Sequence, residues 1–268
     1  MDKIKPIFVD RPVRPQDYDG ILDHLLLVSS IFFTMQGEGP FAGRRAVFIR
    51  LAGCNLGGKG VTGPGCPFCD TDFRLDYCLS MDFTKIINKV EDLYKGDEKR
   101  KLIVITGGEP MLQKNLSGFI RSCPSNFVLQ IESNGTRLLT DLRRTGVTLV
   151  VSPKVPQTSV YDTGAKYGKL SDRVLERADA LKFLVSADID SPYHHVPMYA
   201  KAFQMTGKPV YVSPMAMYRK QPEGIASAWD NTVIDQRKTA DNHQYTCDLV
   251  KHEGYIMSMQ MHLFCGVE

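Results

Sequence analysis

Short apolar runs rich in β-branched residues alternate along the chain with segments whose apolar positions recur every three to four residues. The run RAVFIRL at 45–51 is typical of a buried strand, and FTKIINKVEDLY at 83–94 is typical of an amphipathic helix. The same pattern continues and predicts further strands at 101–106, 127–132, 147–152, 180–186, 209–214 and 255–260. It predicts helices between them at 111–123, 137–146, 171–178, 197–207 and 241–253.

Buried strands that are each followed by a helix indicate a parallel sheet covered by helices. Two folds satisfy this pattern, a partial or complete β/α barrel and an open doubly wound sheet. In both folds the carboxyl ends of the strands form one rim, where ligands bind. The polar clusters of the sequence follow strands at this rim, at 53–73, 107–110, 133–136, 152–154, 213–215 and 261–262. We therefore expect these clusters to converge in space.

The chain is predicted to form one domain over residues 26–268, preceded by an N-terminal extension over residues 1–25 that is rich in Pro and Asp. A net charge of +3 and the lack of a Lys/Arg run argue against a nucleic-acid surface. No apolar window is long enough to predict a transmembrane span, and the first residues lack the apolar core of a signal peptide.

Seven cysteines are present, and four of them lack any metal-like spacing: Cys78, Cys123, Cys247 and Cys265. An odd number of scattered cysteines argues against a secreted disulfide framework and favours a reducing cytoplasm.

The other three cysteines, Cys54, Cys66 and Cys69, share one glycine-rich loop after the strand at 45–51. Thiolates are ligands for zinc or for iron–sulfur clusters. A closed zinc site needs a fourth ligand, and the chain has no second C-x-x-C pair. Three thiolates could instead bind three irons of a cubane and leave the fourth iron open to a substrate or cofactor. The residues alone favour a cluster, with a zinc site or three unligated core cysteines as the alternatives.

Three motifs on the rim have an ordinary structural explanation beside a functional one. TGGEP at 106–110 could be a tight turn, but paired glycines also let a ligand approach the backbone, and Glu109 could face a cationic group. ESNGT at 132–136 could simply cap a helix, and SPK at 152–154 could be a plain loop. Their shared position on the rim favours binding.

Two features near the strand at 45–51 favour a heterocyclic ligand with a carboxylate. The stretch TMQGEGPFAGR at 34–44 could be a flexible loop, or its Gln36 amide and Glu38 carboxylate could bind N–H donors of a guanine-like base. Arg50 lies within an apolar strand, where arginine is rare unless paired. It could form a structural ion pair or clamp a substrate carboxylate. His262 could be an ordinary core histidine.

Taken in order, these motifs resemble the radical S-adenosylmethionine (SAM) superfamily and, more narrowly, its 7-carboxy-7-deazaguanine synthase family. The resemblance runs from about residue 28 to Glu268 and rests on TMQGEGPFAGRRAVFIRLAGC, CDTDF, VITGGEP, ESNGT, VSPK and QMHLFCGVE. It implies an α/β fold, an incomplete (β/α)6 TIM-like barrel of the radical SAM type. The spacing C-x11-C-x2-C differs from the superfamily's usual C-x3-C-x2-C, although longer first gaps occur in this family. Leu263 stands where the family often has a lysine.

The resemblance also implies a role for each group of motif residues. Cys54, Cys66 and Cys69 would bind a [4Fe-4S] cluster, and Thr71 would ligate Mg²⁺. SAM would contact the residues Gly107, Gly108, Glu109, Ser133, Ser152, Pro153 and Lys154. The substrate would be bound by Met35, Gln36, Gly37, Arg50, Thr106 and the C-terminal Glu268. Glu38 and His262 would act at the substrate as catalytic residues.

The implied activity is conversion of 6-carboxy-5,6,7,8-tetrahydropterin to 7-carboxy-7-deazaguanine with loss of ammonia, in queuosine-type biosynthesis. A one-electron reductant such as a flavodoxin would reduce the cluster, and a radical derived from SAM would take the C6 hydrogen of the substrate. We expect a cytoplasmic homodimer with no direct nucleic-acid or membrane partner. The alternatives are another radical SAM enzyme or an activase on the same scaffold, and a zinc-stabilised binding module.

Overall fold

Parallel strands in sequential order form the centre of the sheet. The computed structural model describes residues 14–56, 66, 75, 78–95, 99–144, 146–155, 167–217 and 234–265. In these ranges the strand order is β3-β1-β2-β4-β5-β6-β7-β8-β9. The parallel strands are β2 (Arg45–Leu51), β4 (Lys101–Gly107), β5 (Phe127–Ser133), β6 (Thr148–Val151), β7 (Ala180–Val185), β8 (Val210–Pro214) and the short β9 (Ile256–Met257).

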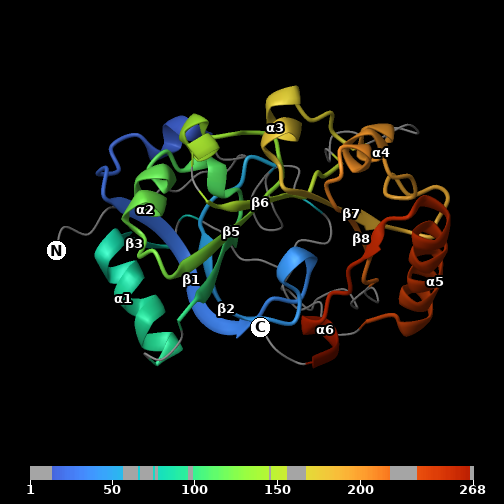
Figure 1. Ribbon diagram of the computed structural model, residues 1–268, viewed down its shortest axis with the longest axis horizontal. Coiled ribbons are helices and arrows are strands. Elements are labelled where there is room, and N and C mark those ends of the chain that lie inside the picture. The colour runs from blue at the N-terminus through green and yellow to red at the C-terminus, as the bar shows by residue number, and fades with distance from the viewer. Residues whose placement is uncertain are drawn as a thin grey trace, which may run out of the picture.

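The sequential order distinguishes between the two folds that the sequence allowed. A doubly wound sheet reverses its strand order at a switch point, and this sheet does not. The sheet curves without closing, so the fold is an incomplete β/α barrel, as predicted (Figure 1). Helices surround its convex side, and these are α1 (Phe83–Tyr94), α2 (Leu116–Ser122), α3 (Asp172–Arg177), α4 (Met198–Met205) and α5 (Gln236–Glu253).

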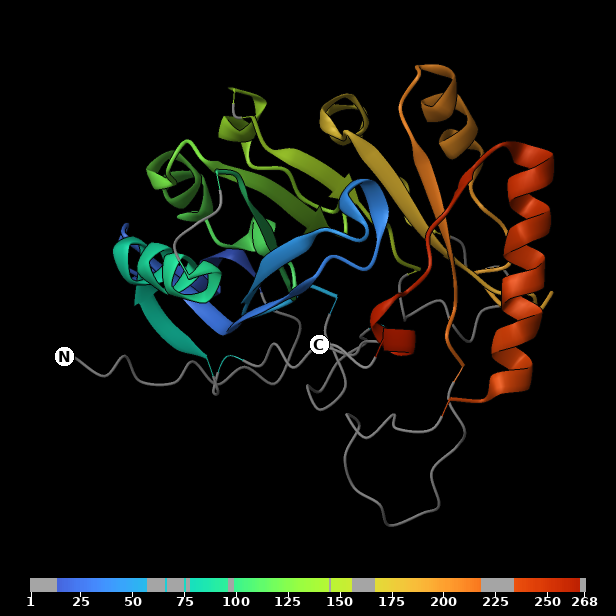
Figure 2. The same ribbon diagram turned by 60° about the horizontal axis from the view of Figure 1, so that its bottom comes forward.

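Two antiparallel strands at one edge of the sheet were not predicted. β1 (Leu25–Met35) pairs with β2, and β3 (Leu79–Asp82) pairs with β1. At the opposite edge β9 pairs with β8, and the short helix α6 (His262–Cys265) follows it. Figure 2 shows α6 below the open side of the curved sheet. Of the strand predicted at 255–260, only the two residues of β9 lie in the sheet.

Two predicted helices have a different form in the structure. The segment predicted as a helix at 111–123 is a 3-10 turn, Pro110–Leu112, followed by α2. The break falls at Gln113, whose backbone is extended because its side chain bonds to both the N–H and the C=O of Leu27. The helix predicted at 137–146 is a 3-10 helix over Thr140–Arg144.

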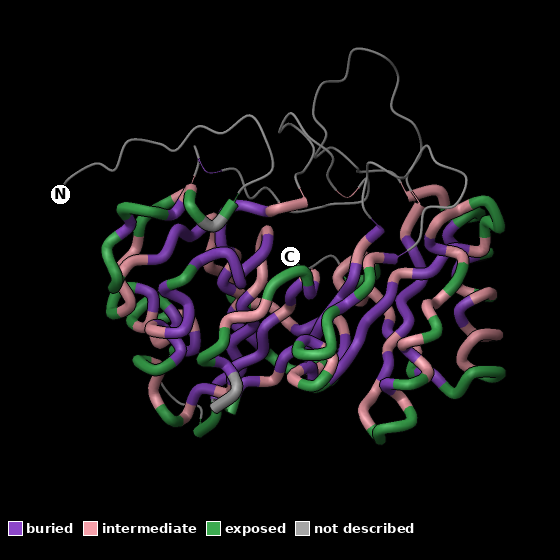
Figure 3. Tube along the Cα trace, turned by 90° about the horizontal axis from the view of Figure 1, so that it is seen from above, coloured by how far each residue is buried: buried purple, intermediate pink, exposed green. Residues whose placement is uncertain are grey.

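Alternate residues of the parallel strands face opposite sides of the sheet. One set is apolar and packs against the helices, as with Val47 and Ile49 of β2 and Ile103 and Ile105 of β4. Buried residues follow the strands, and exposed residues lie on the outer helices and loops (Figure 3). On the inner side, a small apolar cluster around Ala46, Leu102 and Val104 occupies the part nearest the amino ends of the strands. Polar residues follow nearer to the carboxyl ends.

Part of the expected N-terminal extension packs against the sheet. Tyr18 and Ile21 are buried in a cluster with Leu27, Ala52 and Leu112. The Tyr18 hydroxyl donates a 2.7 Å hydrogen bond to the carbonyl oxygen of Ala52, two residues before Cys54. Residues 1–13 lie outside the described residues, so the division at residue 25 stays a prediction. None of the helices that the structure describes has the length and hydropathy needed to cross a bilayer.

Candidate active site

The Gly107-Gly108 turn lies directly against the backbone that leads into the cysteine loop. Gly108 N–H donates to Leu51 O (3.0 Å) and Glu109 N–H donates to Gly53 O (2.8 Å). A Cβ at Gly108 would lie 2.0 Å from Gly53 O, and Gly107 has a φ of +116°. Both glycines are therefore required for this close backbone packing, which fixes Glu109 beside the start of the cysteine loop.

Glu109 is fully buried and points its carboxylate at the loop after β5. Its Oε2 accepts from the backbone N–H of Asn134 (2.7 Å), and its Oε1 accepts from Ser133 Oγ (2.8 Å) and from the N–H of Met111 (3.0 Å). Burial raises the pKa of Glu109 to about 7, because the loss of hydration outweighs these hydrogen bonds and the more distant Lys154 charge. A cationic group brought to this carboxylate would restore its ionised form.

Neither Cys54 nor Cys66, which both lie on this side of the sheet, forms a disulfide bond. Cys54 is buried directly after the strand end. Burial raises the pKa of the Cys66 thiol, and the Lys154 charge acts in the opposite direction. Two cysteines without a disulfide between them, one of them near the Lys154 ammonium, fit thiolate ligation. No set of three metal-ligating side chains is found in the described ranges, and Cys69, Thr71 and Glu268 lie outside them.

The loops after β5 and β6 join the same rim. Ser152 N–H donates to Ser133 O (2.7 Å), and Lys154 Nζ donates to Ser152 Oγ (2.5 Å). Burial lowers the pKa of Lys154, while the nearby thiol and carboxylates oppose this shift. Pro153 is buried between these two residues. The structure thus brings the predicted SAM-contacting segments together at the carboxyl ends of β4, β5 and β6.

A second cluster of charges lies on the inner face of the sheet, and the sequence analysis missed two of its members. Lys182 of β7 is buried, Glu132 of β5 is half-buried, and Lys182 Nζ donates to Glu132 Oε2 (2.7 Å). The same ammonium donates to Glu38 Oε2 (2.8 Å). Lys182 interrupts the apolar run ALKFLV as Arg50 interrupts RAVFIRL, so the rarity of buried charges was the signal that could have found it.

The loop after β1 brings Glu38 to this cluster from an unexpected direction. Met35, the last residue of β1, pairs with Arg45, the first residue of β2, so the loop leaves the sheet at the amino end of β2. It then reaches β7, through Glu38 and Lys182. The Gln36 side chain donates to Glu132 Oε1 (2.9 Å) and accepts from the Glu38 N–H (3.2 Å). Gln36, predicted to bind substrate, therefore has protein partners for both ends of its amide.

The same loop packs against the C-terminal segment. A Cβ at Gly37 would lie 3.3 Å from the backbone nitrogen of Met261 and 3.6 Å from Nδ1 of His262. Gly39 N–H donates to Ser258 Oγ (3.0 Å). His262 and Glu38 therefore come from distant parts of the sequence to adjacent segments of the structure.

Arg50 and Thr106 are register neighbours on β2 and β4, on the inner face. The Arg50 guanidinium lies 4.7 Å from the centre of the Phe32 ring. Within the described ranges Arg50 forms no ion pair with a carboxylate. In this it differs from Lys182, another cation on the inner face, which pairs with Glu38 and Glu132. The charge of Arg50 therefore remains available for a carboxylate that comes from a ligand.

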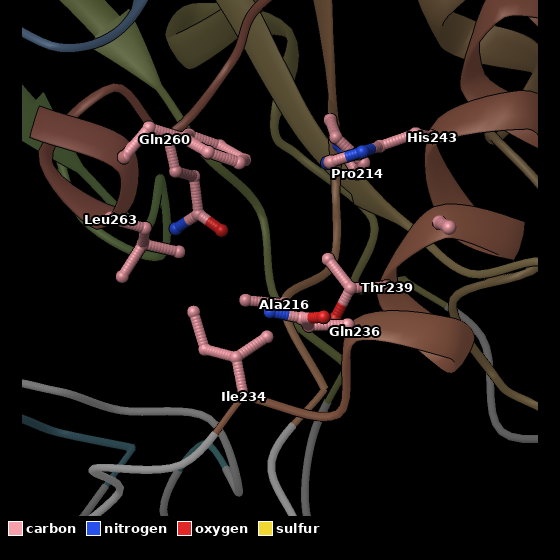
Figure 4. Close-up of a pocket in the computed structure, with 10 residues that line it drawn as sticks. Pro214, Ala216, Ile234, Gln236, Thr239, His243, Gln260 and Leu263 are labelled. Atoms are coloured by element: carbon pink, nitrogen blue, oxygen red, sulfur yellow. The ribbon is translucent and has the colours of Figure 1, made fainter.

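A cavity of about 360 Å³ lies outside this region, between the end of β8, the first half of α5, and α6 (Figure 4). Its lining is mostly apolar and includes Pro214, Ile234, His243 and Leu263. None of the predicted site residues that the structure describes lines it. Leu263, which replaces the lysine common in the resembling family, faces this cavity (Figure 4).

Comparisons with known proteins agree with this architecture. The model of the radical SAM superfamily matches residues 49–198. The 7-carboxy-7-deazaguanine synthase of Rickettsia prowazekii is 35% identical over 247 residues, which cover 91% of this chain and 89% of that protein. The enzyme of the same name from Hyperthermus butylicus is 34% identical over 208 residues, covering 72% of this chain and 79% of that protein.

Among solved structures, the crystal structure of QueE from Escherichia coli shares the fold, with a TM-score of 0.56 and 20% identity over 88% of this chain and 93% of that one. The superfamily match begins at Ile49 and so includes the cysteine loop, the GGEP turn and the loops after β5 and β6. The chain belongs to the 7-carboxy-7-deazaguanine synthase family of the radical SAM superfamily.

Proposed function

We propose that this chain converts 6-carboxy-5,6,7,8-tetrahydropterin to 7-carboxy-7-deazaguanine, with loss of ammonia. Membership of the family supports a radical SAM enzyme of deazaguanine biosynthesis. The observation that carries the specific reaction is the presence of two groups of opposite charge, one on the inner face of β2 and one on the loop after β1. Arg50 offers a cation without a carboxylate partner among the described residues, and Glu38 offers a carboxylate. A carboxylated pterin has the complementary groups, an anion and an edge of N–H donors.

The cofactors of the superfamily, a [4Fe-4S] cluster and SAM, fit the rim. Bound there, they would supply the radical chemistry by which a hydrogen atom is removed from the substrate. Cys54, Cys66 and Cys69 are the proposed cluster ligands. The carboxylate of Glu109 would accept a hydrogen bond from the amino group of SAM, since this buried carboxylate lacks a close cation among the described residues.

The remaining rim residues would bind the rest of the SAM molecule. Ser133 and the Ser152-Pro153-Lys154 segment are joined to one another and to Glu109 by hydrogen bonds. Gly107 and Gly108 act chiefly by allowing the backbone to approach the start of the cysteine loop. The protein's contribution is therefore orientation of SAM against the cluster.

The substrate would lie between this rim and the loop after β1. Arg50 and Thr106 would bind its carboxylate. Met35, Gly37 and Glu38 would bind the pterin ring, with Gln36 fixing Glu38 and Glu132. His262, on α6 beside Gly37, would assist at the reacting side, and the carboxylate of Glu268 would reach the ring.

Three further assignments complete the proposal. Mg²⁺ would bind through Thr71 and the substrate carboxylate, since a hard cation takes oxygen ligands. A one-electron donor such as a flavodoxin would reduce the cluster. The chain would act as a homodimer in the cytoplasm.

Anaerobic reconstitution with iron and sulfide, followed by incubation with SAM, the pterin, Mg²⁺ and a reductant, tests the proposal. Formation of the deazaguanine product with ammonia supports it. SAM cleavage without that product would indicate another radical SAM enzyme or an activase. A colourless protein with stoichiometric zinc would contradict radical chemistry altogether.

A further inference from the structure

Lys182 joins two carboxylates, that of Glu132 on β5 and that of Glu38 on the loop after β1. Its ammonium bonds to Glu132 Oε2 at 2.7 Å and to Glu38 Oε2 at 2.8 Å, and only 8% of its side chain is exposed. Burial would lower the pKa of Lys182, but the two carboxylates outweigh it and raise this pKa above its usual value. Lys182 is therefore a cation over the whole working range of pH.

Both carboxylate oxygens of Glu132 accept hydrogen bonds from the protein. Its Oε2 accepts from Lys182, and its Oε1 accepts from the amides of Gln36 (2.9 Å) and Gln130 (3.0 Å). Burial would raise the pKa of Glu132, but the Lys182 charge and these hydrogen bonds lower it. Glu132 is thus a fixed anion that holds Lys182 in place and is poorly suited to contact a ligand.

Glu38 differs from Glu132 in one respect. Its Oε2 accepts from Lys182, and no described residue donates to its Oε1. The buried Oε1 of Gln130, on the same face of β5 as Glu132, also has no partner. A ligand that brings N–H groups would give the buried Gln130 Oε1 a donor, because a buried acceptor left unpaired is costly, and the partly exposed Oε1 of Glu38 is a second acceptor for such a ligand.

We propose that Lys182 is a positioning residue that clamps one oxygen of Glu38 and so presents the other oxygen to an N–H donor of the substrate. Glu132 fixes the ammonium, and the ammonium fixes Glu38. The inference rests on the proposed function, because it identifies the N–H-bearing edge of the pterin as the group that this carboxylate recognises. The Lys154 ammonium, after β6, also acts electrostatically on Lys182, Glu38 and Glu132.

The single variant Lys182→Met removes the clamp and leaves two half-buried carboxylates facing each other. The expected result is a lower melting temperature and a KM for the pterin raised about tenfold to 100-fold, the worth of one charge-assisted hydrogen bond. SAM affinity should change far less than the KM, since Lys182 donates its hydrogen bonds to Glu38 and Glu132 and affects the proposed SAM-binding residue Lys154 only through its charge. Lys182→Arg keeps the cation, so its KM for the pterin should lie between those of the wild type and of Lys182→Met.

The double variant Lys182→Met/Glu132→Gln separates positioning from charge balance. It removes one cation and one anion together, so the melting temperature should recover toward that of the wild type. The KM should remain high, because Glu38 still lacks its clamp. A purely structural role for Lys182 predicts that both quantities recover together, and that result would overturn the proposal.

Lys101→Met is the matched control. Lys101 is as buried as Lys182 and pairs with Glu91, but it lies at the amino end of β4, away from the site. It should lower the melting temperature without changing the KM. Absence of pterin turnover in the wild type would contradict the proposed function, whereas turnover with an unchanged KM in the Lys182 variants would contradict only the clamp.

Discussion

Asn55, the residue after Cys54, is hydrogen-bonded to Asn134 in the loop after β5, with 3.0 Å between Asn134 Nδ2 and Asn55 Oδ1. The Asn55 amide also donates to Thr136 Oγ1 at 2.8 Å. Because the backbone N–H of Asn134 donates to Glu109, one loop fixes both the first cysteine and the buried carboxylate. If Cys54 and Glu109 have the proposed roles, the relative position of the cluster and of SAM depends on this contact.

Asn55→Ala should make the cluster less stable, because it removes both hydrogen bonds next to Cys54. With each of the two bonds worth about 1 kcal/mol, loss of cluster absorbance in air should be roughly five- to 30-fold faster than in the wild type. Iron and sulfide content per chain should fall in parallel. Asn115→Ala is the control, since Asn115 also donates two hydrogen bonds, to Leu22 O and Leu25 O. Equal rates of bleaching in the two variants would refute the coupling.

The affinity for SAM should depend on pH through Glu109. Burial raises the pKa of this carboxyl to about 7, so the SAM-free protein must release a proton there before a cationic amino group binds. Affinity should rise about tenfold from pH 6 to pH 8 and then level off. Anaerobic calorimetry in buffers of different ionisation enthalpy would measure both the affinity and the proton released.

Glu109→Gln provides the check on that assignment. Its SAM affinity should be lower at pH 8 and flat across the range. The raised pKa also means that the folded SAM-free protein binds more protons than the unfolded chain between pH 4.5 and about 7. Its free energy of unfolding should therefore fall as the pH rises through this window, and the variant should lose that slope. A wild-type affinity independent of pH would exclude Glu109 as the partner of the amino group.

Gly108→Ala should disrupt the junction between the GGEP turn and the cysteine loop. The new Cβ would meet Gly53 O at 2.0 Å and Cys54 N at 3.0 Å, and these backbone atoms cannot move without shifting the loop. We expect a loss of at least about 1–3 kcal/mol in the free energy of unfolding, together with reduced iron content. Gly146→Ala, where no atom lies within 4 Å of the new Cβ, should change neither quantity. Full iron loading of the Gly108 variant would contradict the packing role.

Arg50→Ala should weaken binding of the substrate far more than binding of SAM. Loss of a charge-assisted pair with the substrate carboxylate should raise the KM for the pterin about tenfold to 100-fold. Arg45→Ala, at the exposed start of the same strand, is the control. Titrations of both ligands against both variants would measure the difference. Equal losses of affinity for the pterin and for SAM in the Arg50 variant would count against binding of the substrate carboxylate by Arg50.

The strands and helices with strong periodicity were predicted closely. β2 and α1 have the predicted bounds, 45–51 and 83–94, because an apolar β-branched run and an Asp82-capped amphipathic segment are unambiguous. β1 and β3 were missed because a pattern of strands alternating with helices carries no signal for antiparallel strands at the edge. α5 begins five residues before the predicted start, at Gln236, where Asp235 accepts the Lys238 N–H. The first turn of α5 was not predicted because it contains few apolar residues.

The rim was predicted from connectivity, since the carboxyl ends of parallel strands converge whatever the sequence. The inner wall was not. Lys182 and Glu132 lie 50 residues apart and meet only through the curvature of the sheet. Glu38 reaches them from a loop that leaves the amino end of β2, so no argument about the rim could place it there. The roles proposed for the individual residues stay predictions until the variants are measured.

The most direct test of the central claim is an anaerobic turnover assay with 6-carboxy-5,6,7,8-tetrahydropterin, SAM, Mg²⁺ and a reductant, with products identified by mass spectrometry. Cys66→Ala, which removes one proposed cluster thiolate, is the negative control, with its fold checked by circular dichroism. The account predicts 7-carboxy-7-deazaguanine and ammonia in equal amounts from the wild type and neither from the variant. Product formed at the wild-type rate by the Cys66 variant, or no deazaguanine from a fully reconstituted wild type, would contradict it.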